Sequence, residues 1–146
     1  MNYHITTDLN HMDFELIHEF LSQSYWSKGI SKPVLKKAFK NSLCFAIFSD
    51  QKQLGFARMI TDRSTFAYLA DVFIVPEYQG QGLSKKLLDF VFTHPDLQGF
   101  RRMMLATSDA HGLYKKYGFT ALQYEEVFME CWNPDIYQSQ TDPQKG

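Results

Sequence analysis

Residues 66–92 of the chain read FAYLADVFIVPEYQGQGLSKKLLDFVF, and this stretch decides the fold. Its first ten residues are apolar, aromatic and β-branched, and Pro76 ends them because proline cannot donate a hydrogen bond to a sheet. They predict a buried strand. In the second half, Leu83, Leu87 and Val91 recur every four residues, which predicts a helix with one apolar face.

The loop between this strand and this helix, residues 79–84, contains Gly80 and Gly82. Glycine lets the backbone turn sharply and lets a ligand approach without a Cβ in the way. A helix start carries unpaired N–H groups and partial positive charge, so the loop suits a phosphate or pyrophosphate, although an ordinary tight turn explains the glycines equally simply. A Walker loop is excluded by spacing, and a dinucleotide fingerprint is excluded because Lys85 stands where a third small residue is needed.

Length and composition indicate one globular domain over residues 1–146. Hydrophobic residues make up 45% of the chain and aromatic residues 16%, which is too apolar for a disordered protein. The 15 basic and 16 acidic residues give a net charge of −1, and no basic stripe alternates with aromatic residues. We therefore expect no nucleic-acid partner.

The amino-terminal residues contain neither the basic nor the apolar segment of a signal peptide. No apolar run approaches the roughly 18 residues that a membrane span needs. We expect a cytoplasmic protein without a membrane partner. Cys44 and Cys131 lie far apart in the sequence, and both are expected to be buried, reduced thiols.

Hydrophobic periodicity and turn residues predict the remaining elements. In chain order we expect a strand at 3–7, a helix at 13–21, a helix at 31–40 capped by Ser31, a hairpin of 43–48 with 54–60, a strand at 101–107, a short helix at 109–119 capped by Ser108 or Asp109, a final strand at 121–132 and a frayed tail at 138–146. The strand at 101–107 follows a crossover helix, so it should lie parallel to the central strand and make the sheet mixed.

Two motifs resemble those of the GCN5-related N-acetyltransferase (GNAT) superfamily. The first is the glycine loop with the preceding residues 75–78, and the second is Ala110-x-x-Leu113-Tyr114 followed by Gly118-Phe119. Ser84 stands where the family usually has Gly or Ala, and Thr107 stands where the family often has Asn. The resemblance covers essentially the whole chain and implies an α/β fold: a mixed, mainly antiparallel sheet with helices on both faces and central strands splayed around acyl-CoA.

The same resemblance implies acetyl-CoA as co-substrate and no metal. It assigns the acyl-pantetheine arm to backbone groups of the central strand, the pyrophosphate to the glycine loop, and one further contact to Thr107. The implied cofactor residues are Val72, Phe73, Ile74, Gln79, Gly80, Gln81, Gly82, Leu83, Ser84, Lys85 and Thr107. Tyr114 stands where the family's general acid meets the thioester sulfur.

The acceptor residues are less specified by the sequence. Asp71 is either the general base or a structural carboxylate. Tyr25 and Trp26 either form walls of the acceptor site together with Tyr68 or cap the core. Aromatic walls with a carboxylate suit an ammonium group, which favours a small primary amine as acceptor. A protein N-acetyltransferase, a non-catalytic acyl-CoA-binding or regulatory module, and either a monomer or a homodimer remain open.

Overall fold

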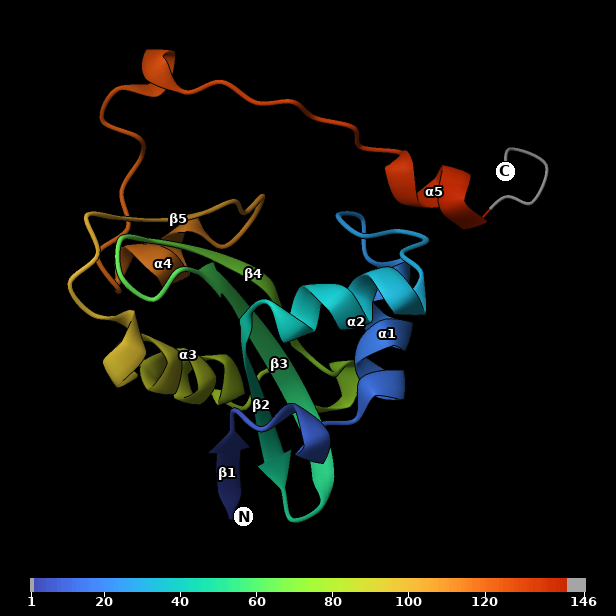
Figure 1. Ribbon diagram of the computed structural model, residues 1–146. Coiled ribbons are helices and arrows are strands. Elements are labelled where there is room, and N and C mark those ends of the chain that lie inside the picture. The colour runs from blue at the N-terminus through green and yellow to red at the C-terminus, as the bar shows by residue number, and fades with distance from the viewer. Residues whose placement is uncertain (1, 142–146) are drawn as a thin grey trace.

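The fold is built on one five-stranded sheet, as the computed structural model in Figure 1 shows; the structure describes residues 2–141. The strands lie in chain order: β1 (Tyr3–Thr6), β2 (Leu43–Ser49), β3 (Lys52–Thr61), β4 (Phe66–Ile74) and β5 (Arg102–Leu105). Neighbouring strands from β1 to β4 are antiparallel, whereas β5 is parallel to β4. The predicted hairpin, crossover and mixed α/β sheet are confirmed.

Helices cover both faces of the sheet. The helices of the chain are α1 (Phe14–Gln23), α2 (Lys32–Lys40), α3 (Leu83–Thr93), α4 (His111–Lys115) and α5 (Ile136–Thr141). Figure 1 shows α3 on one side of the sheet and α1 with α2 on the other. On β2, Phe45 and Ile47 belong to the core under α3, while Cys44 and Ala46 belong to the core under α1 and α2. The continuous apolar run of β2 is thus explained by burial on both faces.

The central strand β4 separates from β5 after four residue pairs. The pairing ends where Leu69 lies opposite Leu105, yet β4 continues to Ile74. On its other side, the β3–β4 register shifts so that Asp71 and Val72 together lie opposite one residue of β3. This β-bulge gives Asp71 a φ of +58°. The expected splay of the central strands is confirmed, and it leaves one edge of β4 open beyond Leu69.

The carboxy-terminal part differs from the sequence-based expectation. The strand predicted at 121–132 is wrong: residues 125–127 form a 3₁₀ turn, and the rest is irregular. Val127 and Met129 are 66% and 97% exposed, because this segment runs past the sheet in Figure 1 without joining it. Between them, the ring of Phe128 lies 4.8 Å from the guanidinium of Arg102 on β5. Apolar character predicted a strand here, but a strand also needs a neighbour for its backbone, and within residues 2–141 the segment pairs with none.

Three smaller expectations also need correction. Helix α4 starts at His111 with Ala110 as its N-cap, and neither Ser108 nor Asp109 provides the predicted capping bond. A helix, α5, stands where the tail was expected to fray, and residues 142–146 of that prediction lie outside the described residues. Cys44 is buried as predicted, but Cys131 is exposed because it lies on the segment that leaves the sheet.

Candidate active site

The glycine loop borders a cavity of about 300 Å³ at the start of α3. Gly80 and Gly82 have φ values of +80° and +78°, a region that glycine enters without steric cost. Gly82 is the N-cap of α3, so the amides of the next three residues begin the helix without intrahelical partners. Gln79 Nε2 donates a 3.0 Å hydrogen bond to the carbonyl of Ile74 and ties the loop to the end of β4. The loop therefore presents amides without intrahelical partners beside this cavity.

A second cavity, of about 560 Å³, lies where β4 and β5 separate. Its walls come from four parts of the chain: Tyr25 and Trp26 from the α1–α2 loop, Tyr68, Asp71 and Val72 from β4, Thr107, Ser108 and Asp109 after β5, and Tyr114 from α4. Tyr25 Oη and Ser108 Oγ are 3.3 Å apart and form a hydrogen bond between two of these walls. Aromatic side chains and two carboxylates therefore line one open pocket.

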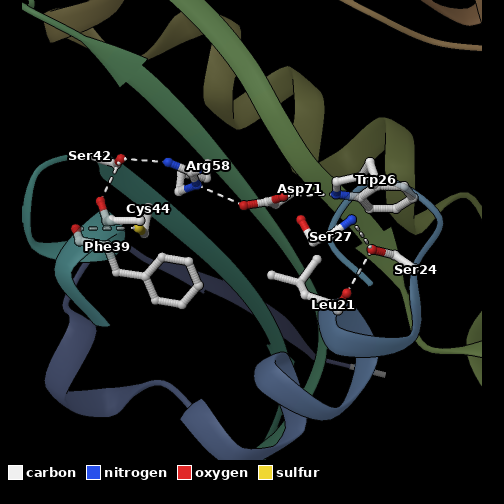
Figure 2. A network of polar contacts seen from close by, with 10 residues as sticks. Leu21, Ser24, Trp26, Ser27, Phe39, Ser42, Cys44, Arg58 and Asp71 are labelled. Atoms are coloured by element: carbon white, nitrogen blue, oxygen red, sulfur yellow. Dashed lines mark hydrogen bonds and ion pairs between the residues drawn. The ribbon is translucent and has the colours of Figure 1, made fainter. Parts of the chain in front are cut away.

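Asp71 is the centre of a polar network on this cavity (Figure 2). The residue is only 6% exposed, and both of its carboxylate oxygens are engaged. Oδ1 accepts a 2.9 Å hydrogen bond from the indole Nε1 of Trp26, and Oδ2 accepts a 2.7 Å bond from Nε of Arg58. Arg58 Nη1 donates in turn to Ser42 Oγ at 3.0 Å. The network connects the α1–α2 loop to the bulge of β4 and to β3.

Tyr114 is 8% exposed, and its ring packs edge-on against Phe119 at a centroid distance of 6.0 Å. Burial raises the pKa of its phenol, and the nearby carboxylate of Asp109 raises this pKa further. Both effects keep the phenol protonated at neutral pH. Tyr114 is therefore available as a proton donor at the cavity.

The structure brings most of the sequence-predicted residues together around these two cavities. Phe73 is buried and lies opposite Phe56 of β3. Thr107 Oγ1 accepts from the amide of Ala110 at 3.1 Å and also lines the larger cavity. Lys85 forms an ion pair with Asp89 at 2.9 Å, one turn along α3.

Sequence reasoning missed Arg58, Ser108 and Asp109. Arg58 offered a signal, because a lone arginine inside an apolar strand needs a buried acidic partner. Ser108 and Asp109 were considered only as helix caps, and nothing in their spacing indicated that they line a cavity.

Comparison with known proteins identifies the family. Residues 14–119 match the model of the acetyltransferase (GNAT) family. The chain belongs to the GNAT family of acetyltransferases. A crystal structure of a GNAT-family acetyltransferase from Xanthomonas campestris pv. campestris is 50% identical, with a TM-score of 0.91, and the match covers 94% of this chain and 97% of that one. A Gibberella zeae protein named as an acetyltransferase is 31% identical over 138 residues, covering 79% of this chain and 77% of the relative.

More distant GNAT structures share the fold alone. A Clostridium acetobutylicum acetyltransferase solved with acetyl-CoA has a TM-score of 0.63 at 16% identity, covering 89% of this chain and 94% of that one. The described residues of the GNAT chain contain no group of three or more His, Cys, Asp or Glu side chains placed to hold a metal. Within the same residues, none of the helices has the length and apolar character that crossing a membrane requires.

Proposed function

We propose that this GNAT-family protein transfers the acetyl group of acetyl-CoA directly to the primary amine of a small molecule. The observation that carries the proposal is the pair of cavities, one against the glycine loop and one at the splay, each bordered by residues of β4. The first suits a pyrophosphate, and the second is lined by aromatic and acidic side chains that suit an amine. The distant structure solved with acetyl-CoA supports the choice of cofactor.

The open edge of β4 supports a role for Val72, Phe73 and Ile74 in holding the acyl-pantetheine arm. Beyond Leu69 the backbone of β4 has no β5 partner, so N–H and C=O groups on that side could pair with the amide groups of the arm. The Ile74 carbonyl already accepts a hydrogen bond from Gln79 Nε2. An arm bound here would extend from the glycine loop toward the splay. The thioester would then lie near Tyr114.

The proposed chemistry needs one proton donor and one nucleophile. The acceptor first loses a proton to water and attacks the thioester carbonyl as a neutral amine, which forms the C–N bond. The intermediate collapses as the C–S bond breaks, and Tyr114 donates its proton to the leaving thiolate. The phenolate recovers a proton that the new amide nitrogen loses, so amine and acetyl-CoA yield one amide and one free thiol. The Tyr114 phenol lines the larger cavity and is protonated at neutral pH, as a proton donor must be.

The shape of the larger cavity favours a small acceptor over a protein. Tyr25 and Trp26 are 74% and 41% exposed, and they stand at the cavity rather than in the core. With Tyr68 they form aromatic walls, and an ammonium group near such walls gains about 0.5–2 kcal/mol from cation–π attraction. A peptide acceptor would instead need an extended groove with exposed strand edges or charged rims.

Two measurements test the proposal. Thermal unfolding should shift upward with acetyl-CoA and coenzyme A but not with ATP or ADP at the same concentration. The release of free thiol from acetyl-CoA should then be followed with a panel of small primary amines and with lysine-containing peptides. We expect release with small amines. Binding of acetyl-CoA without release for any amine would favour a non-catalytic module, and release with peptides alone would identify a protein acetyltransferase.

A further inference from the structure

We propose that the two carboxylates of the larger cavity have separate roles: Asp71 holds the Trp26 wall in place together with Arg58, while Asp109 binds the ammonium group of the acceptor. This inference rests on the proposed function, because it concerns the acceptor of the same reaction. It assigns Asp71 a positioning role and adds Asp109 and Arg58 to the residues that shape the site.

The contacts of Asp71 favour the positioning role. Its side chain is 3% exposed, and its two oxygens already accept from Trp26 Nε1 and Arg58 Nε. The remaining lone pairs of this carboxylate are buried with the side chain, so an incoming amine has little access to them. Breaking a buried ion pair is strongly destabilising because the remaining charge has lost its partner. Asp71 is therefore better suited to fix the indole than to receive a proton from the acceptor.

The bulge explains why Asp71 reaches both partners. Its φ of +58° interrupts the alternation of β4 and turns the carboxylate toward the α1–α2 loop and β3 at once. Trp26 lies in the α1–α2 loop, 45 residues before Asp71 in the sequence. The indole N–H bond to Asp71 orders that loop at the cavity, and the Arg58 bond to Ser42 continues the support toward β2.

Asp109 differs from Asp71 in its exposure and in its partners. It is exposed, lines the same cavity, and takes part in none of the ion pairs of the described residues. It also lies near enough to Tyr114 for its charge to act on the phenol. Since the charge of Asp71 is balanced by Arg58, Asp109 supplies the net negative charge of the cavity. An ammonium group attracted to Asp109 would arrive beside the proton donor and face the aromatic walls.

This arrangement also defines the class of acceptor. Because Arg58 balances the charge of Asp71, the carboxylate of Asp109 is the one that would repel an acidic substituent next to the amine. The preferred acceptor should be a compact primary amine without a carboxylate or phosphate near the nitrogen. Phenethylamine should therefore be a better acceptor than phenylalanine, which carries the same ring and amine plus a carboxylate.

The kinetic test uses phenethylamine with Asp71→Asn, Trp26→Phe, Asp109→Asn and the control Asp50→Asn, which removes a carboxylate from the β2–β3 turn. Asp109→Asn should raise the KM for phenethylamine about tenfold and reduce the preference over phenylalanine, with the KM for acetyl-CoA unchanged. Asp71→Asn and Trp26→Phe should each raise the KM for phenethylamine several-fold with kcat little changed. Because both act on one contact, their double variant should resemble either single variant. Asp50→Asn should behave as the wild type.

A spectroscopic test does not depend on turnover. The chain has two tryptophans, so in a Trp132→Phe background one indole N–H resonance remains, that of Trp26. Asp71→Asn should shift this resonance and Asp109→Asn should not. Titration with phenethylamine should perturb it in the background protein, and Asp109→Asn should weaken that binding. An unchanged resonance in Asp71→Asn would overturn the positioning role even if the protein acetylated no amine at all.

The pH dependence separates positioning from base catalysis. If Asp71 were the general base, Asp71→Asn would lower kcat by roughly 10²-fold or more and abolish the acidic limb of the pH–rate profile. The proposal predicts that this limb persists. A lost limb would overturn the role of Asp71, and a KM in Asp109→Asn equal to that in Asp50→Asn would overturn the role of Asp109. If acetyl-CoA binds but no amine reacts and phenethylamine fails to perturb Trp26, both the proposed acceptor and the role of Asp109 are wrong.

Discussion

Replacing Gly82 by valine tests the cofactor seat with a control that the structure itself supplies. Gly82 has a φ of +78°, and Gly99, which lies after α3 and away from the glycine loop, has the same φ. A Cβ at either position would meet no protein atom within 4 Å. The two substitutions therefore introduce the same backbone strain and no steric clash within the protein.

The strain of a left-handed, non-glycine residue costs about 1–2 kcal/mol, so Gly82→Val and Gly99→Val should lower the free energy of unfolding by similar amounts. Only Gly82→Val places a branched side chain in front of the amides that begin α3. Loss of one hydrogen bond to a charged phosphate costs about 1.5–3 kcal/mol, which is roughly 10- to 150-fold in affinity.

The assay combines urea denaturation with calorimetric titration of acetyl-CoA. Both variants should unfold at lower urea than the wild type, and only Gly82→Val should bind acetyl-CoA more weakly. Equal acetyl-CoA affinities in the two variants would refute the assignment of the pyrophosphate to the glycine loop. Weakened binding in both would show that strain, rather than the loop, controls affinity.

Three further predictions follow from the same site and core. Tyr114→Phe keeps the ring but removes the phenolic proton, so kcat should fall roughly 10²-fold with acetyl-CoA affinity unchanged. An unchanged rate of the chemical step in rapid-quench kinetics would reject Tyr114 as the general acid. Trp26→Ala should raise the KM for the amine several-fold while the KM for acetyl-CoA stays constant. A parallel rise in both KM values, with normal stability by urea denaturation, would contradict the placement of Trp26 in the acceptor site. Burial raises the pKa of the Cys44 thiol to about 12, so a thiol reagent at neutral pH should label exposed Cys131 rapidly and Cys44 only in urea. Fast labelling that persists in Cys131→Ser would contradict the burial of Cys44.

Local patterns were sufficient to predict the elements that pack on the sheet. The helix capped by Ser31, the hairpin of β2 with β3 and the parallel β5 all follow from periodicity and turn residues, and all are confirmed. The strand predicted at 121–132 failed because apolar residues indicate a need for burial without specifying a partner. In the described chain these residues remain largely exposed.

Only part of the candidate site could be predicted from the sequence. The glycine loop is contiguous in sequence, so its two left-handed residues and its helix start could be anticipated from chemistry. The Trp26–Asp71–Arg58 network could not, since its members are 45 and 13 residues apart and meet only because the bulge turns Asp71 toward both partners. No spacing rule encodes such a contact.

The central claim, direct transfer of acetyl from acetyl-CoA to an amine, is tested most directly by product stoichiometry. The protein should be incubated with acetyl-CoA alone and then with phenethylamine, while mass spectrometry follows the intact protein and the amide and a thiol reagent follows coenzyme A. Direct transfer predicts an unmodified protein, little thiol before the amine is added, and afterwards one thiol for each amide. Accumulation of an acetylated protein, or thiol release without a matching amide, would contradict the account.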